Sequence, residues 1–357
     1  MKQHAVKRIF RTGEMMSRCL SIFVALLITL TVVQTDRTAN GQVQQDGSKT
    51  QAAISDSADA KLKAFFENQS QEEAAGKGDP ESQVLLGLSL ITGVYTEKDP
   101  ERGIRLLTEA ANKGHSGAQA QLGMIYFGGS DEIKQDQPRG VKWFHKAAVQ
   151  GESLAQLMLA QCYEKGVGVK KDLSEAFQWY LRLAEQGEPL AQWQVGGFFI
   201  KGVSVDQDFE EAERWFRKAA DQGYAEAQQA LAGLYFEGLG VDKDLAEAAR
   251  WLEKSAQQGH ASAQFQLGVF YAQGMGVEKD YEKAVQWYQK AAAQNDVSAQ
   301  VNLGAMYLEG FGVEKNKQEA VNWYRKAAEQ GFEPANQALK WLAEKKEEPS
   351  SSPESLR

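Results

Sequence analysis

The chain has 357 residues, of which 43% are hydrophobic and 25% are charged, and its formal net charge is −8. This composition excludes a mostly disordered protein and a polytopic membrane protein. An acidic surface repels the phosphate backbone of DNA and RNA, so we expect no nucleic-acid partner. The only two cysteines, Cys19 and Cys162, cannot build a disulfide framework.

The N-terminal segment predicts export. Basic residues precede an uncharged, apolar run at 20–33, and a polar stretch follows it. As a helix this run would rise about 21 Å, short of the roughly 30 Å hydrocarbon core, which is typical of a secretory signal peptide. Small residues favour cleavage before Gln42, and Met15 or Met16 are alternative starts. An uncleaved membrane anchor is the alternative, and only then would the membrane be a partner.

Composition divides the rest of the chain. Signal peptide 1–41 is followed by a Gln- and Ser-rich stretch at 42–57, which predicts a disordered linker. A capping helix is expected at 58–77. Repeats fill 78–331. A second capping helix is expected at 332–345, before a disordered tail at 346–357.

A period of about 36 residues is the clearest feature of the sequence. Its marker is a glutamine, found at Gln83, Gln119, Gln156, Gln192, Gln228, Gln264 and Gln300. Three residues after each glutamine stands Leu or Val, then Gly or Ala, and seven residues after it an aromatic in six copies. This spacing puts the large residues on one face of a helix, here called helix A, and the small residue lets a second helix approach closely.

A glycine-containing turn separates helix A from a second predicted helix, helix B. Turns such as Gly166-Val-Gly168 lack the preceding strand of a phosphate-binding loop, so we interpret the glycines as helix ends. Helix B is expected to begin at a capping residue, in chain order Asp99, Asp136, Asp172, Asp208, Asp244, Asp280 and Asn316. A glutamate three residues later, as at Glu211, predicts a capping box in four copies.

Six tryptophans stand seven residues after these caps, at Trp143, Trp179, Trp215, Trp251, Trp287 and Trp323. Such a stripe is compatible with sugar stacking. The fixed spacing instead favours a wedge between consecutive hairpins. Stacked hairpins that bury their apolar faces against neighbours form a solenoid.

The combined pattern, Ala-x-x-x-Ala-Gln-x-x-Leu-Gly-x-x-Tyr, Gly-x-Gly-Val and Asp-x-x-x-Ala-x-x-Trp-x-x-Lys-Ala-Ala-x-x-Gly, resembles the Sel-one-like repeats (SLR), relatives of tetratricopeptide repeats; residues 263–276 and 280–292 match it nearly throughout. The resemblance implies an all-α, right-handed α-solenoid of about seven helix-turn-helix repeats with capping helices at both ends. It also implies a scaffold or adaptor that binds other proteins and needs no cofactor. A cysteine-rich branch of the family has been linked to penicillin binding and hydrolysis, but this chain lacks those cysteines.

No catalytic constellation stands out, and no histidines or cysteines have metal-ligand spacing. Cys162 occupies a core position of its repeat. His115 and His260 share a turn position that tolerates Glu, Tyr and Phe in other copies, and His145 occupies a surface position. We therefore predict no catalytic, cofactor-binding or metal-binding residue, and no enzyme.

The predicted partner site lies where the repeats differ. By analogy with tetratricopeptide grooves, positions one, five and eight after the glutamine face the concave side. These include Trp193, Ile200, Phe236 and Phe265, which are expected to form an apolar strip that binds a protein or peptide. The alternative is that these side chains only pack between helices.

The sequence thus predicts an exported, periplasmic or secreted, non-enzymatic scaffold. The alternatives are a weak amide hydrolase or penicillin-binding protein, and a membrane-anchored envelope adaptor.

Overall fold

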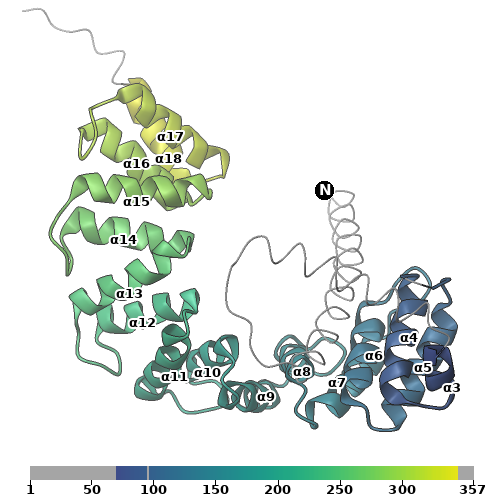
Figure 1. Cartoon of the computed structure of the whole chain (residues 1–357). Helices are drawn as coiled ribbons and strands as arrows, with labels where there is room; N and C mark the ends of the chain where they lie inside the picture. Colours follow the sequence, from purple (N-terminus) through teal and green to yellow (C-terminus); the bar gives the residue numbers. More distant parts are fainter. Residues whose placement is uncertain (1–69, 95, 345–357) are drawn as a thin grey trace, which may run out of the picture. The chain divides into compact units, whose positions relative to one another are not determined.

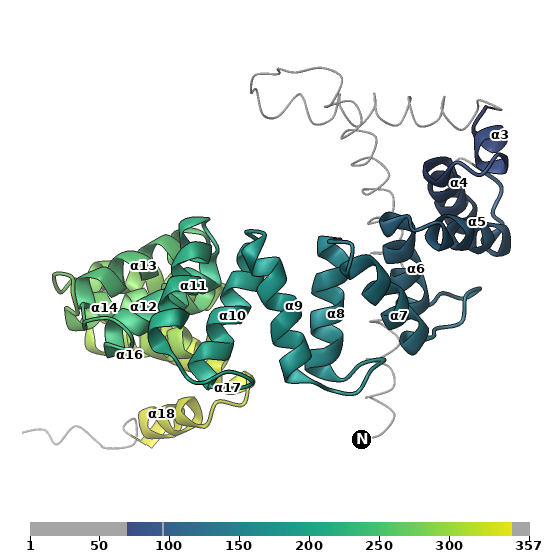
Figure 2. The same ribbon diagram turned by 90° about the horizontal axis from the view of Figure 1, so that it is seen from below.

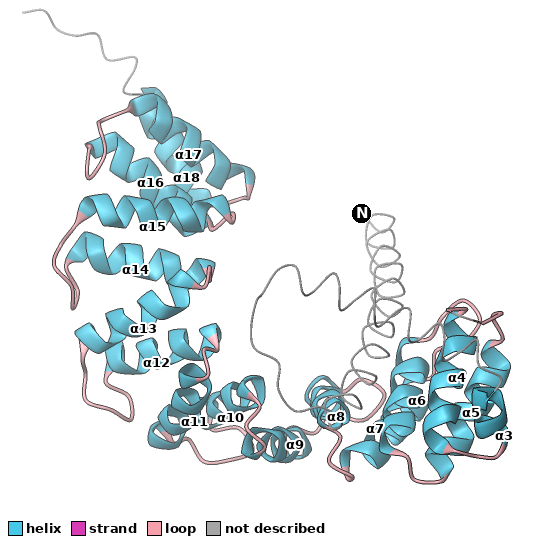
Figure 3. Cartoon of the chain, viewed as in Figure 1, coloured by secondary structure: helices cyan, strands magenta, loops and turns pink. Residues whose placement is uncertain are grey.

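The computed structural model describes residues 70–94 and 96–344, so the predicted signal peptide, linker, C-terminal tail and residues 58–69 of the expected capping helix lie outside the described residues. Within that range the chain forms sixteen α-helices and no strand (Figures 1 and 3). The helices are α3 (Ser70–Gly76), α4 (Pro80–Thr92), α5 (Pro100–Asn112), α6 (Ser116–Gly128), α7 (Gln137–Ala148), α8 (Ser153–Lys165), α9 (Leu173–Glu185), α10 (Pro189–Lys201), α11 (Phe209–Asp221), α12 (Ala225–Glu237), α13 (Leu245–Gln257), α14 (Ala261–Gln273), α15 (Tyr281–Ala293), α16 (Val297–Glu309), α17 (Lys317–Glu329) and α18 (Glu333–Glu344). The predicted all-α repeat solenoid is confirmed.

The chain divides into two compact units, with the division inside α9. Unit 1 ends at Trp179 and unit 2 begins at Tyr180. Within each unit the main contacts join helices that follow one another along the chain, for example α6 with α7 in unit 1 and α12 with α13 in unit 2 (Figure 2). The even-numbered helices α4 to α16 are helix A of the seven repeats, and the odd-numbered helices α5 to α17 are helix B. This nearest-neighbour packing is the hallmark of a solenoid.

Each helix B begins at its predicted cap. In α11 the carboxylate of Asp208 accepts the backbone N–H of Glu211 at 2.9 Å. The other half of the predicted capping box is wrong, because the N–H of Asp208 donates to the carbonyl of Phe199 in helix A at 3.1 Å. The Glu211 side chain pairs instead with Arg214. The cap therefore also closes the hairpin.

The small residue of helix A allows the close approach that the sequence predicted. A Cβ added at Gly268 in α14 would lie 2.6 Å from the ring of Tyr288 in α15. Real side chains do not approach so closely, so this helix pair requires a glycine. The same ring-on-glycine contact occurs at Gly196 against Phe216 and at Gly304 against Tyr324.

Candidate functional site

The four residues of the predicted strip all lie on helix A of unit 2. Trp193 and Ile200 belong to α10, Phe236 to α12 and Phe265 to α14. All four side chains are partly buried. The structure therefore gives each of them both a packing contact and an exposed portion, and their surroundings distinguish two pairs.

Phe236 and Phe265 line one cavity. It has a volume of about 370 Å³ and lies between α12 and α14, with Leu252 of α13 also contributing. Its lining is Ala232, Gly233, Phe236, Glu237, Leu252, Phe265, Gln266, Val269, Phe270 and Met275. Most of these side chains are apolar, and Glu237 and Gln266 are the polar ones. A cavity of this size and character suits an apolar side chain of a bound partner.

Two features of α12 and α14 hold the cavity open. Gly233 has no side chain, and a Cβ placed there would meet nothing within 4 Å. The two phenylalanine rings are held by neighbouring rings, Phe236 at 5.7 Å from Phe270 and Phe265 at 5.9 Å from Tyr288, measured between centroids. Aromatic pairs at such distances are attractive, so both rings are pre-positioned before any partner arrives.

Trp193 and Ile200 do not line this cavity. Both pack against the buried core formed by α11 to α14. The Trp193 ring lies 6.0 Å from the ring of Tyr224. Phe236 packs against the same core, so packing between helices is shared by three of the four residues, and only Phe236 and Phe265 line the cavity between α12 and α14.

The repeat-marking glutamines position the helix A surface. Gln228 in α12 is 4% exposed; its Nε2 donates to the carbonyl of Ala220 at the end of α11 at 3.1 Å, and its Oε1 accepts from Nε2 of Gln258 after α13 at 2.8 Å. One amide thus links α12 to the C-terminal ends of both neighbouring B helices. The same pair of bonds recurs at Gln119, Gln192 and Gln264. In the sequence these glutamines are recognisable only as markers of the repeat period, and their hydrogen bonds are visible only in the structure.

The tryptophan stripe belongs to the packing between hairpins. Trp251 is 3% exposed in the core of α11 to α14, and Trp287 packs against that same core from the next helix B. In five of the six copies a lysine three residues later lies over the tryptophan ring, with Nζ of Lys254 3.7 Å from the Trp251 centroid. Such cation–π contacts stabilise the helix surface.

Comparison with known proteins identifies the repeat. The Sel1 repeat matches seven segments, at residues 80–115, 116–152, 153–188, 189–224, 225–260, 261–296 and 297–332. The chain belongs to the Sel1 repeat family. Each segment contains one helix A and one helix B, so the family repeat coincides with the structural hairpin. A comparison with curated proteins gave no match.

Two solved Sel1-type structures resemble this chain along most of its length. One is c5321, a protective antigen of uropathogenic Escherichia coli strains with an SLR fold, at 34% identity and a TM-score of 0.71. The match covers 77% of this chain and 58% of that protein's length. The other is a Sel1 repeat protein from Oxalobacter formigenes, at 31% identity and a TM-score of 0.65, covering 84% of this chain and 83% of that one. Sel1 repeat proteins are generally non-catalytic scaffolds that bind protein partners.

The titratable residues singled out in the sequence have structural contacts in this Sel1 protein. Cys162 is buried, and burial raises the pKa of its thiol to about 11, although the nearby Lys165 acts in the opposite direction. A raised pKa disfavours the thiolate form that a nucleophile needs. His115 caps α6 by accepting the N–H of Ala118 at 3.1 Å, and its Nε2 lies 2.9 Å from a carboxylate oxygen of Glu81.

His145 and His260 likewise form no catalytic arrangement with another described residue. The His145 ring packs edge-on against Trp179 at 5.8 Å, and His260 precedes α14 without a side-chain cap bond. Among residues 70–94 and 96–344, no group of three or more His, Cys, Asp or Glu side chains is placed to hold a metal ion. None of the helices in these same ranges combines the length and the apolar character needed to cross a bilayer.

Proposed function

We propose that this Sel1 repeat protein is an exported scaffold that binds a protein or peptide partner through the helix A surface of unit 2. The observation that carries the proposal is the cavity between α12 and α14, where Phe236 and Phe265 are fixed by their neighbours and Gly233 leaves an opening. An apolar cavity beside aromatic side chains is the usual anchor point of an interface. The partner contributes one apolar side chain to it.

The charge of the chain indicates what surrounds that side chain in the partner. Glu237 lines the cavity, and the chain as a whole carries a net charge of −8. Opposite charges at the rim of an interface speed association and orient the partner. The proposed partner segment is therefore an apolar residue flanked by basic ones.

Filling the cavity tests this proposal without removing a packing contact. Gly233→Leu places a side chain where nothing lies within 4 Å. It also replaces glycine inside a helix, which favours folding by about 1 kcal/mol. The matched control is Gly197→Leu, the same change at the same repeat position in α10, where there is also open space.

The assay is affinity capture from the exported fraction of the source cells, with both variants and the native chain in parallel. We expect one protein to be held by the native chain and by Gly197→Leu and to be lost with Gly233→Leu. Equal capture by both variants would refute the cavity as the binding site. Circular dichroism of each variant checks that helicity is unchanged.

Export is part of the same proposal and has its own test. The intact mass of the protein recovered from cells is expected to match a chain that begins at Gln42. A mass that retains the apolar run at 20–33 would instead support the membrane-anchored adaptor.

A further inference from the structure

The turn between α6 and α7 in unit 1 departs from the regular turns. The turn after α8 runs from Gly166 to the cap Asp172, whereas this one runs from Gly129 to the cap Asp136 and is one residue longer. It also lacks the second glycine. In the turn after α12, that second glycine, Gly240, lies so close to the carbonyl of Phe209 that a Cβ could not fit. A regular turn thus closes against the start of the preceding helix B.

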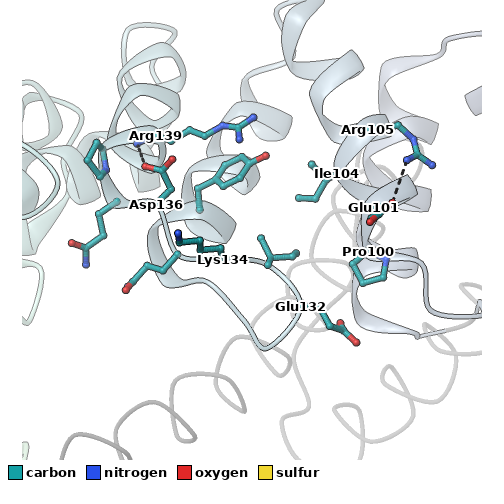
Figure 4. A pocket seen from close by; sticks show the side chains of 13 residues that line it. Pro100, Glu101, Ile104, Arg105, Glu132, Lys134, Asp136 and Arg139 are labelled. Carbon is teal, nitrogen blue, oxygen red and sulfur yellow. Dashed lines mark hydrogen bonds and ion pairs between the residues drawn. The ribbon is translucent and has the colours of Figure 1, made fainter.

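Without that closure, a cleft of about 840 Å³ opens in unit 1 (Figure 4). One wall is the first turn of α5, with Pro100, Glu101, Ile104 and Arg105. The other wall is the long turn and the start of α7, and Tyr126 of α6 also lines the cleft. The cleft is within the range of volumes that proteins use for small ligands and short peptide segments.

The long turn is held in place by specific contacts. The backbone N–H of Ser130 donates to the carbonyl of Ile133 at 2.8 Å, and the Ser130 hydroxyl accepts the N–H of Ile133 at 3.1 Å. Lys98, before α5, forms an ion pair of 2.7 Å with Glu132. Hydrogen bonds within the turn and an ion pair to the residue before α5 therefore fix the position of the turn, so the cleft is preformed.

Two cationic side chains in the cleft, Arg139 and Lys134, are available to bind an anionic group of a ligand. The guanidinium of Arg139 lies over the Tyr126 ring, with its Cζ 3.9 Å from the ring centroid, and forms no hydrogen bond or ion pair with any residue in the described ranges. The Lys134 ammonium group likewise forms no hydrogen bond or ion pair with a residue in the described ranges. Two of the nearby carboxylates are already engaged, Glu132 with Lys98 and Asp136 with the N–H that it caps. Arg139 is therefore positioned for a carboxylate in the bidentate geometry that guanidinium favours.

Apolar surface lies next to these cations. Ile104, Ile133, Pro100 and Pro138 contribute to the same lining, on both walls of the cleft. Glu101, whose side chain is 92% exposed, contacts Arg105 only at 3.9 Å and leaves an acceptor for backbone N–H groups. A ligand that fits must combine one carboxylate, an apolar side chain and N–H donors.

We propose that this cleft binds the C-terminus of a peptide whose last residue is apolar. The terminal carboxylate pairs with Arg139 and Lys134, the last side chain packs on Ile104 and Ile133, and peptide N–H groups face Glu101. Phosphate-bearing ligands fit less well, because the three carboxylates of the lining oppose a second negative charge. The site uses none of the residues of the α12–α14 cavity, so either can fail without the other.

The test uses the full chain and an array of short peptides with free C-termini, in which the last two residues are varied over all amino acids. A second array carries the same peptides as C-terminal amides. We expect binding to free acids with Leu, Ile, Val, Met or Phe at the end, and a loss of about tenfold or more as amides. Arg139→Met should cause a similar loss and Arg139→Lys a smaller one. Lys142→Met, which removes an exposed charge from the same helix outside the cleft, should change nothing.

A second variant removes the long turn, including Lys134, while Arg105 and Arg139 stay in place. Residues 129–135 are replaced by the six residues 166–171, Gly-Val-Gly-Val-Lys-Lys, which restores the regular turn and keeps a lysine beside the cap. Binding should disappear while circular dichroism stays unchanged. The proposal is overturned if no peptide binds, if acids and amides bind equally, or if Arg139→Met binds as well as the native chain.

Discussion

The buried glutamine of each repeat offers a quantitative test of how helix A is held between its neighbours. In Gln228→Glu the buried Nε2, which donates to the carbonyl of Ala220 at 3.1 Å, becomes a carboxylate oxygen facing that carbonyl. The site is 4% exposed. A buried, unpaired carboxylate costs several kcal/mol, so we expect the free energy of unfolding at pH 7 to fall by about 3–5 kcal/mol.

The comparison variant Gln228→Leu should cost less. It removes two hydrogen bonds, each worth about 1 kcal/mol, but introduces no charge. The carbonyl of Ala220 keeps its bond from the N–H of Gly223 at 2.9 Å, and the exposed Gln258 amide is free to bind water. We therefore expect a loss of about 1–2 kcal/mol. The control, Gln286→Glu at an exposed position of α15, should change stability by less than about 0.5 kcal/mol.

The pH dependence separates the charge from the lost hydrogen bonds. Burial raises the folded-state pKa of the introduced glutamate, so the folded form retains its proton where the unfolded form has lost it. The loss in free energy of unfolding caused by Gln228→Glu should therefore be largest at pH 7. It should shrink as the pH falls toward about 4.3, the pKa of glutamate in the unfolded chain. The deficit of Gln228→Leu should not change.

Urea unfolding followed by circular dichroism, at pH 7 and at pH 4.5, measures these differences. Hydrogen exchange then locates them, because the amides of α11 to α13 should lose protection before those of distant repeats. Equal stability of Gln228→Glu and Gln286→Glu at pH 7 would refute the proposed role of the glutamine link.

Three further variants or measurements probe the turns and the core. Ser204 adopts a left-handed φ of 65° where other turns have glycine, so Ser204→Gly should raise the free energy of unfolding by about 0.5–1 kcal/mol in urea titrations; no gain would contradict the assigned strain. Gly268→Ala forces a Cβ against Tyr288 and should lower the same quantity by about 1–3 kcal/mol, and an unchanged midpoint would show that the helices separate freely. Native Cys162 should react with iodoacetamide at a rate that rises only as the pH approaches 11, whereas a rise centred near pH 8.5 would show an accessible, ordinary thiol.

The repeat architecture was predictable because its signals are local. The capping aspartates, the glycine turns and the spacing of aromatic residues all act within one hairpin, and the structure places α11 to start directly after Asp208 as expected. The role of Gln228 was not predictable by the same route. Its partners lie eight residues before it, at the end of α11, and 30 residues after it, directly after α13.

The candidate sites show where the sequence stops being informative. Positions counted from the glutamine identified a helix face, and all four residues of the predicted strip lie on helix A. Whether a residue on that face borders a cavity depends on its neighbours in other helices. Gly233 has no side chain, which leaves a cavity beside Phe236 and Phe265, whereas the ring of Tyr224 packs against Trp193. The irregular turn after α6 was visible as a departure from the pattern. The contact of Gly240 with Phe209 shows how a regular turn closes against the preceding helix B, and the turn after α6 is one residue longer and has no such contact from a glycine.

Photo-crosslinking in the source cells tests the scaffold account most directly. A photoreactive phenylalanine analogue replaces Gln266, which lines the cavity in α14, or Gln286, which is exposed on α15. The account predicts one dominant crosslinked protein from position 266, absent from position 286 and lost when Gly233→Leu is added. Crosslinks that are the same from both positions, or that persist with the cavity filled, would contradict it.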